Sequence, residues 1–334
     1  MAKTSDILRD SFGREHNYLR ISLTEKCNLR CTYCMPENGI VLTPKSQLMT
    51  TDEVIEIATL FVKNGVDKIR LTGGEPLLKK DFSEILMALS KLPVHLSITT
   101  NAILVDRYID TFKQCNLKNI NVSLDTLNPD KFDVITKRDH FDKAFQNLNL
   151  LLNSGFNLKL NVVLMKNFNE DEIIDFIDFT KDKNIGVRFI EFMPFDGNSW
   201  DISKLISYNE ILDKVISHFS EGELITLKNE KNYTARNFKI ENYKGSFGII
   251  STVTNPFCDG CNRIRLTANG RLKNCLFSNN ETDLLTAYRA GEQIEHLIQN
   301  AIQSKKAVRA GMTKSEDFGN TTNHDNRSMI AIGG

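Results

Sequence analysis

The sequence carries no excess of charge of either sign, because 42 basic residues are balanced by 42 acidic residues. Dedicated nucleic-acid-binding proteins usually carry a positive excess, so this balance argues against that class. Long hydrophobic runs are also absent: no stretch approaches the roughly 18 apolar residues that a membrane-spanning helix needs. Acidic residues, Asp6, Asp10 and Glu15, stand where a signal or transit peptide would avoid them. We therefore expect a cytoplasmic protein that binds neither nucleic acid nor membranes.

Cysteine is scarce, yet six of the seven cysteines fall into two tight groups. An odd number of clustered cysteines without an evident export signal favours metal ligation over disulfide bonds. The seventh, Cys115, follows apolar positions of a predicted helix, and we expect it to be a buried structural thiol.

Short β-rich runs alternate with segments of helical periodicity in the first two thirds of the chain. The predicted strands cover residues 18–23, 68–72, 95–99, 119–124, 159–164 and 187–193. Because parallel neighbours need a crossover helix, six such units in series predict an α/β fold with a parallel sheet. Periodicity alone leaves open a doubly wound sheet or a partial barrel. In both, the site lies where the strands run into the following loops.

The sequence pattern changes after Pro194. A predicted loop at 195–200 is followed by a predicted helix over 208–219 and a strand-like, glycine-punctuated stretch over 235–254. We place a boundary near residue 200, which gives an N-terminal domain over 1–200 and a C-terminal domain over 201–334.

The first cysteine group consists of Cys27, Cys31 and Cys34, in the loop predicted to follow the first strand. Three thiolates can hold three irons of a 4Fe-4S cube and leave the fourth iron open to a small chelating molecule. The alternative is a structural zinc site. Such sites are usually closed by four ligands, and no fourth Cys or His lies close by in the sequence.

This cysteine spacing, with Tyr33 directly before the third cysteine, resembles that of the radical S-adenosylmethionine superfamily. A second shared element is the run 72–76, Thr-Gly-Gly-Glu-Pro, whose glycines let backbone approach a ligand closely. The resemblance implies a six-unit partial (β/α) barrel. It also implies S-adenosylmethionine bound at the open iron and a 5'-deoxyadenosyl radical that abstracts hydrogen from the substrate. By the same resemblance Tyr33, Gly74, Ser123 and Met193 line the S-adenosylmethionine pocket.

The second cysteine group, Cys258, Cys261 and Cys275, repeats the first: three thiols and no fourth. The third thiol follows a predicted hairpin that turns at Asn269-Gly270. One iron of a second cube would again lack a protein ligand. A zinc ribbon that lacks one ligand is the alternative for this group taken alone.

The run 257–265, followed by Cys275, closely resembles the GTP 3',8-cyclases, and the similarity extends from about residue 12 to the end of the chain. The resemblance implies a C-terminal domain that closes the open side of the barrel and carries a second 4Fe-4S cluster, which binds the guanine of GTP. It also implies a set of GTP-binding residues: Arg20, Arg70, Thr99, Lys159, Arg263, Ile264 and Arg265. Arginine suits a triphosphate because its paired donors match phosphate oxygens, and strand alternation places Arg263 and Arg265 on one face.

The last two residues, Gly333 and Gly334, also match this family, in which the tail reaches into the active site. The resemblance implies catalytic roles for these glycines and for Arg263 and Arg265. It further implies conversion of GTP to 3',8-cyclo-7,8-dihydroguanosine triphosphate, the first step of molybdenum cofactor biosynthesis. The implied partners are an electron donor, a cyclic pyranopterin monophosphate synthase that receives the product, and a second copy of the chain in a homodimer.

Two other function classes remain open at this point. A radical S-adenosylmethionine enzyme that modifies a peptide would also carry auxiliary clusters, although such proteins usually have more C-terminal cysteines. A zinc-dependent regulatory or nucleic-acid-binding module would explain the cysteines as structure. Zinc without sulfide in the purified protein would favour that module.

Overall fold

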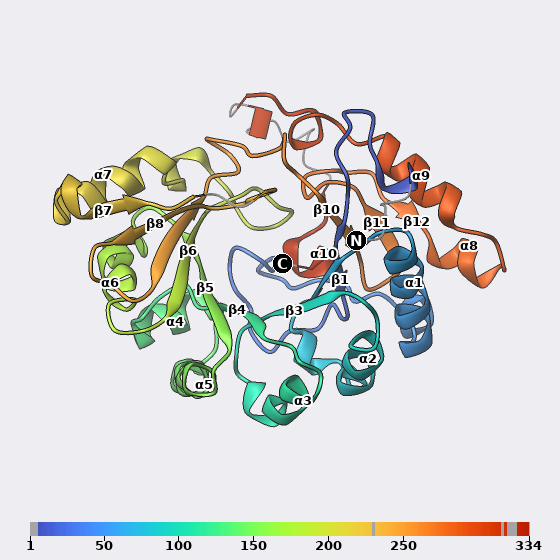
Figure 1. Cartoon of the computed structure of the whole chain (residues 1–334), viewed down its shortest axis with the longest axis horizontal. Coiled ribbons are helices and arrows are strands. Elements are labelled where there is room, and N and C mark those ends of the chain that lie inside the picture. The colour runs from blue at the N-terminus through green and yellow to red at the C-terminus, as the bar shows by residue number, and fades with distance from the viewer. Residues whose placement is uncertain (1–5, 229–230, 315–316, 319–325, 334) are drawn as a thin grey trace.

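The computed structural model describes residues 6–228, 231–314, 317–318 and 326–333. One curved sheet of 12 strands organises these residues, in the order β12-β11-β10-β1-β2-β3-β4-β5-β6-β9-β8-β7. Helices cover its convex side, while the C-terminal helix α10 lies on the concave side (Figure 1). The sheet ends at β12 and β7.

Six βα units form the middle of this sheet, and neighbouring strands are parallel. The strands are β1 (Tyr18–Ser22), β2 (Lys68–Thr72), β3 (His95–Thr100), β4 (Asn119–Ser123), β5 (Asn157–Leu164) and β6 (Ile185–Glu191). The helices that connect these strands are α1 (Thr51–Lys63), α2 (Phe82–Leu89), α3 (Ile109–Gln114), α4 (Pro129–Thr136), α5 (Phe141–Asn153) and α6 (Ile173–Asp178), with both α4 and α5 between β4 and β5. This arrangement confirms the predicted partial barrel.

One predicted strand boundary is wrong in a way that affects the site. The sixth strand was expected to end at Met193, but β6 ends at Glu191, whose register partner Leu164 is the last residue of β5. Beyond that pair β5 offers no further backbone groups to bond. Met193 therefore lies in the loop after the strand rather than in it.

The residues after 200 extend the same sheet at both edges. β10 (Arg263–Leu266), β11 (Arg271–Lys273) and β12 (Thr282–Asp283) continue it beyond β1. β9 (Ser246–Ile250), β8 (Arg236–Ile240) and β7 (Leu224–Thr226) continue it beyond β6. The helices of this part are α7 (Tyr208–His218), α8 (Leu285–Arg289), α9 (Glu295–Gln303) and α10 (Met329–Ile332).

The predicted hairpin at Asn269-Gly270 is confirmed, since β10 and β11 pair antiparallel. Gly270 has a φ of +68°, which a side chain would strain, and an added Cβ would overlap the Leu285 side chain. The hairpin matters because it places the third cysteine of the second group beside the first two.

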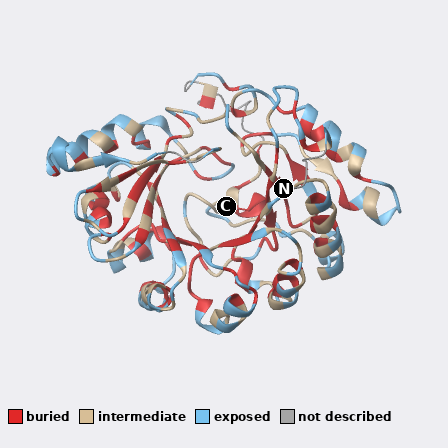
Figure 2. Ribbon diagram, in the orientation of Figure 1, coloured by how far each residue is buried: buried red, intermediate tan, exposed pale blue. Residues whose placement is uncertain are grey.

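The main hydrophobic core fills the space between the sheet and the outer helices, and Cys115 lies in it as expected. Figure 2 shows the buried residues concentrated in the strands and on the helix faces that meet them. A second, smaller core joins the loop after β6 to the C-terminal segment, from Phe195 to Phe318 and Ile332. Among the described residues, no helix combines the length and apolar character needed to cross a membrane.

Candidate functional site

A cavity of about 290 Å³ lies on the concave side of the sheet, where the parallel strands end. All of the clustered cysteines line it: Cys27, Cys31, Cys34, Cys258, Cys261 and Cys275. Each of them is a free, partly buried thiol. Two groups more than 200 residues apart in the sequence therefore face one chamber. Within the described residues, no group of three or more His, Cys, Asp or Glu side chains could hold a metal ion. A 4Fe-4S cube makes a different demand, because each thiolate binds its own iron.

The first cysteine loop follows β1 and folds over on itself. The backbone N–H of Cys34 donates to the carbonyl of Cys31 at 2.9 Å, and the N–H of Leu29 donates to the sulfur of Cys27 at 3.4 Å. Burial, together with the nearby charge of Glu75, raises the pKa of Cys27 to about 11. Burial also raises the pKa of Cys31 and that of Cys34. Binding of iron to these thiols would therefore displace protons.

The glycine turn after β2 presses directly against this loop. The N–H of Gly74 donates to the carbonyl of Thr24 at 2.7 Å, and the N–H of Glu75 donates to that of Lys26 at 2.8 Å. A Cβ on Gly74 would overlap the Lys26 carbonyl and stand 3.1 Å from the Cβ of Cys27. Only glycine allows this approach, so the turn fixes the position of the first cysteine.

The carboxylate of Glu75 points back into the protein. It accepts hydrogen bonds from the Thr100 hydroxyl and the Asn101 N–H, both at 2.8 Å. Burial raises its pKa to about 7, although these hydrogen bonds oppose the shift. This side chain therefore ties the turn after β2 to the end of β3.

The other residues predicted for the S-adenosylmethionine pocket, Tyr33, Ser123 and Met193, also line the cavity. Tyr33 donates its hydroxyl proton to Asp125 at 2.9 Å, and the other oxygen of Asp125 accepts from the Val163 N–H at 2.8 Å. Burial raises the pKa of Asp125 to about 6. The Tyr33 ring is thus held in a fixed direction beside the cysteines.

The second cysteine group surrounds a tight turn and the hairpin. The N–H of Cys261 donates to the carbonyl of Cys258 at 3.0 Å, and Cys275 follows β11. Burial raises the pKa of Cys261, but the charges of Lys305 and Arg263 outweigh it and bring the value down to about 6. Burial raises the pKa of Cys258. The surroundings of the second cysteine group are therefore more positive than those of the first.

A row of arginines crosses three neighbouring strands beside the second group. Arg20 on β1 is the register partner of Arg265 on β10 and of Arg70 on β2. Arg70 donates to the hydroxyl of Tyr18 at 2.5 Å and to the Thr99 hydroxyl at 3.3 Å. The structure therefore brings three of the predicted GTP-binding arginines together on neighbouring strands, and two of them, Arg20 and Arg265, line the cavity.

Two guanidinium groups of the cavity wall, those of Arg20 and Arg263, each have a buried N–H donor without a hydrogen-bond partner among the described residues. These donors are the Nε of Arg20 and one terminal nitrogen of Arg263. A buried donor left unpaired costs about 1–3 kcal/mol, and more when it is charged. Both side chains line the cavity, so an anion bound there would supply the missing acceptors.

Three predicted GTP-binding residues lie outside the cavity lining. Arg70 is held by Tyr18, as described above. The side chain of Ile264 packs in the main core. Its backbone pairs with Leu19 of β1. Lys159 is exposed and alternates with the buried residues of β5, on the same strand face as Asn161 and Val163, which do line the cavity.

The C-terminal tail enters the concave side. Met329 lines the cavity, and the N–H of Ile330 donates to the carbonyl of Cys34 at 3.3 Å. The carbonyl of Gly333 accepts a hydrogen bond from Arg265. A Cβ on Gly333 would come within 2.6 Å of the Thr72 hydroxyl. Gly334 lies outside the described residues.

Sequence reasoning missed several residues of the cavity wall. Asp125 could have been found, because it follows the predicted end of the fourth strand, where a site is expected. Asn161 could also have been found by strand alternation from Lys159. Arg309 gave no signal, since it comes from an irregular segment after α9 and reaches the cavity only through tertiary packing.

Comparison with known proteins agrees with this site. Residues 21–180 match the Radical SAM superfamily, and residues 185–310 match the Molybdenum Cofactor Synthesis C family. The chain is 47% identical to the mitochondrial GTP 3',8-cyclase of Arabidopsis thaliana, over 99% of this chain and 84% of that protein. It is 39% identical to the GTP 3',8-cyclase of Listeria welshimeri, over 98% of this chain and 99% of that one. The chain belongs to the GTP 3',8-cyclase family.

Relatives in this family differ in length. The chain is 45% identical to human molybdenum cofactor biosynthesis protein 1 over 99% of its own residues but only 52% of that protein, so it spans about half of the human relative. The crystal structure of Streptococcus suis SuiB superposes with a TM-score of 0.64 at 15% identity, covering 96% of this chain and 78% of SuiB. At that identity the likeness shows the fold alone.

Membership of the radical SAM superfamily implies a 4Fe-4S cluster and S-adenosylmethionine as cofactors. The residues present fit both groups. Three thiols on one loop match the ligand set of a cube with one open iron. Gly74 lines the cavity beside these thiols, and its close contact with the Lys26 backbone leaves no room for a side chain. Tyr33 and Ser123 line the same cavity.

Proposed function

We propose that this chain converts GTP to (8S)-3',8-cyclo-7,8-dihydroguanosine 5'-triphosphate, as a lyase of the radical SAM superfamily that acts first in molybdenum cofactor biosynthesis. The observation that carries the proposal is the meeting of two thiol triads and buried, unpaired arginine donors around one cavity. When bound, the first cluster and S-adenosylmethionine supply one-electron cleavage of the sulfonium and abstraction of hydrogen from substrate.

The protein's own residues bind and orient the reactants in this scheme. Arg20, Arg263 and Arg265 hold the triphosphate, and Cys258, Cys261 and Cys275 hold a second 4Fe-4S cluster against which the guanine lies. Support comes from the buried guanidinium nitrogens and from the thiols beside them in the cavity wall. Fixing the nucleotide at both ends sets the ribose at a defined distance from the first cysteine loop, which favours reaction by proximity.

Anaerobic incubation of the reconstituted, reduced protein with S-adenosylmethionine and GTP tests the activity. One hydrogen atom leaves GTP with 5'-deoxyadenosine, and one electron and one proton are then added. The product therefore has the mass of GTP but a different chromatographic retention. Formation of 5'-deoxyadenosine at the same rate with and without GTP would contradict the substrate assignment.

Metal and sulfide analysis tests the second cluster separately. Replacing Cys275 by alanine should remove about half of the iron and acid-labile sulfide, because one of two similar cubes loses a ligand. Replacing Cys115, which is buried in the core and is not among the residues that line the cavity, serves as the matched control. Zinc in place of iron and sulfide would end the cluster assignment.

The proposal includes partners that this chemistry requires. A donor must supply electrons one at a time, and a cyclic pyranopterin monophosphate synthase would receive the product. We also propose a cytoplasmic homodimer. Sedimentation of the anaerobic protein measures its oligomeric state.

A further inference from the structure

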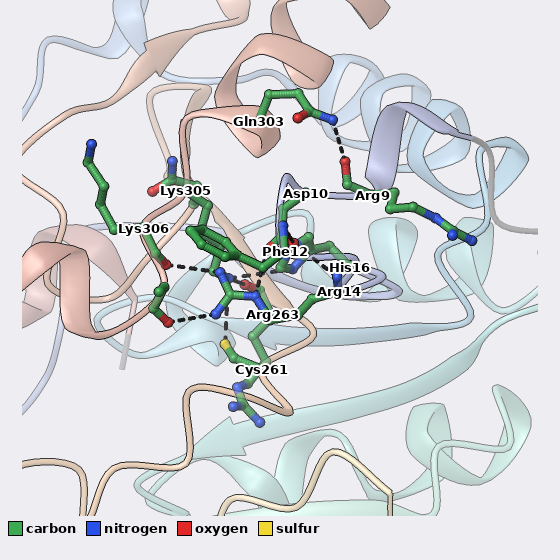
Figure 3. Close-up of polar contacts among 12 residues, drawn as sticks. Arg9, Asp10, Phe12, Arg14, His16, Cys261, Arg263, Gln303, Lys305 and Lys306 are labelled. Carbon is green, nitrogen blue, oxygen red and sulfur yellow. Dashed lines mark hydrogen bonds and ion pairs between the residues drawn. The ribbon is translucent and has the colours of Figure 1, made fainter.

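Three buried ionisable residues gather behind the second cysteine group, outside the cavity wall. They are Asp10 and His16, which precede β1, and Lys305, which follows α9 (Figure 3). Their exposed fractions are 4%, 0% and 4%. None of the three lines the cavity, so the reaction scheme above does not use them.

The ammonium group of Lys305 has three protons and three acceptors. It lies 3.0 Å from the carbonyl oxygen of Arg263, 3.5 Å from the sulfur of Cys261 and 3.4 Å from Nδ1 of His16. A lysine side chain can only donate, so Nδ1 of His16 must accept. Each donor of this buried cation is therefore used, and one of them is directed at a cysteine of the second group.

The imidazole of His16 is held in the tautomer that this contact requires. Burial lowers the pKa of His16 to about 3, and the charge of Lys305 adds to the effect, so the ring is neutral. Its proton sits on Nε2, which lies 3.1 Å from the carboxylate of Asp10. Asp10 in turn accepts from the Nε of Arg14 at 2.6 Å. The chain of contacts from Asp10 through His16 thus fixes where Lys305 can stand.

The two cysteine groups differ in their electrostatic surroundings. Carboxylates, Glu75 and Asp125, lie near the thiols of the first group, and the neutral side-chain amide of Asn101 donates to the sulfur of Cys27 at 3.9 Å. Cys261 instead faces Lys305 and Arg263. Cations and hydrogen bonds directed at ligand sulfur favour the reduced state of an iron-sulfur cluster, because they offset the added negative charge.

We propose that Lys305, held in place by His16 and Asp10, is a positioning residue that fixes Cys261 and raises the reduction potential of the second cluster. The inference rests on the second cluster of the proposed function. It assigns a task to a buried cation that touches neither substrate nor S-adenosylmethionine.

The test is a potentiometric titration of the anaerobic holoenzyme, followed by electron paramagnetic resonance. The signal of the second cluster is the one that Cys275→Ala removes. In Lys305→Met the ratio of reduced to oxidised second cluster at a fixed potential should fall about tenfold, which is about 59 mV for one electron. The signal of the first cluster should not move. The matched control is Lys306→Met, which makes the same charge change at the next, exposed residue.

His16→Phe tests the supporting chain, because it keeps a buried ring but removes the acceptor for Lys305. It should shift the potential in the same direction by a smaller amount. The double variant should equal Lys305→Met alone, since His16 acts only through Lys305. If Lys305→Met loses the second cluster and keeps the first, the positioning role is supported. If Lys305→Met loses both clusters, the same titration is carried out on Lys305→Gln. This variant keeps a hydrogen-bond donor at the position and removes the charge, so the potential of its second cluster decides.

An unchanged potential of the second cluster in Lys305→Met or Lys305→Gln would overturn this inference while leaving the proposed function intact. Absence of any signal that depends on Cys275 in the unaltered protein would instead overturn the second cluster, and the role of Lys305 with it.

Discussion

Tyr18 sits among cations in a way that should make it a phenolate near neutral pH. Its hydroxyl oxygen accepts from Arg70 at 2.5 Å, while the guanidinium carbon of Arg20 lies 5.9 Å and the ammonium of Lys68 lies 4.8 Å from its ring centroid. Burial raises the pKa of Tyr18, but the charges of Arg70 and Arg20 outweigh it and bring the value to about 6. The phenolate thereby balances part of the arginine row until an anionic substrate arrives.

The stability that this ionisation contributes follows from the sign of the shift. The pKa in the folded protein lies below the ordinary value of 10, so the contribution is complete above pH 10 and is lost as the pH falls through about 6. At pH 8, two units above the folded value, it amounts to about 3 kcal/mol, at about 1.36 kcal/mol per unit. Tyr18→Phe should remove this contribution, and the difference from the unaltered protein should shrink as the pH approaches 6.

Two measurements check this reasoning. The absorbance difference at 295 nm between the unaltered protein and Tyr18→Phe should show a phenolate that titrates with a midpoint near pH 6. Urea unfolding under anaerobic conditions should show the pH-dependent loss of stability. GTP should raise the pH midpoint of the tyrosine titration, because its triphosphate would compete with the phenolate for the same cations. A stability difference that does not change between pH 6 and pH 8, or a tyrosine difference spectrum that titrates only near pH 10, would refute the argument.

Three further variants test the site. Gly74→Ala should lose the first cluster, because the added Cβ overlaps the cysteine loop, and the iron content should fall. Gly222→Ala is the control and should keep its iron, because a Cβ there meets nothing within 4 Å. Arg20→Met should raise the KM for GTP at least tenfold with a smaller effect on kcat, since the side chain binds rather than reacts. Glu281→Gln breaks the 2.9 Å pair with Arg327 that holds the C-terminal segment and should speed trypsin cleavage after Arg327, measured by mass spectrometry. Unchanged cleavage would show that the pair does not anchor the segment.

Local pattern was enough to predict the six strands, because each carries apolar residues at alternate positions, which bury one face of the strand. The second strand, Lys68–Thr72, is the same in sequence and structure. Both cysteine groups could be predicted for a similar reason, since spacing within a loop is a local property. The predicted end of β6 was wrong because the strand stops where its neighbour stops, and no feature of residues 187–193 records the length of β5.

The sequence predicted which arginines form the row, but not that they lie side by side in the sheet. Arg20 and Arg265 are 245 residues apart, and only the parallel pairing of β10 with β1 makes them neighbours. A sequence pattern assigns a residue to a strand and a face, whereas register across non-consecutive strands depends on the whole sheet. Tyr18, an ordinary strand residue in the sequence, was not recognised as the partner of Arg70 because the register between β1 and β2 is not set by the pattern of either strand alone.

The segment before β1 shows most clearly what local patterns leave out. Arg14 donates to the carbonyl of Cys258 at 3.0 Å and to that of Lys306 at 2.9 Å, while Gln303 donates back to the Arg9 carbonyl at 2.7 Å. These contacts join residues 244 to 294 positions apart. They hold the turn that carries the second cysteine group between the segment before β1 and the residues at the end of α9. Because a thiol ligand is useful only where its neighbours hold it, the second site depends on residues that carry no cluster chemistry of their own.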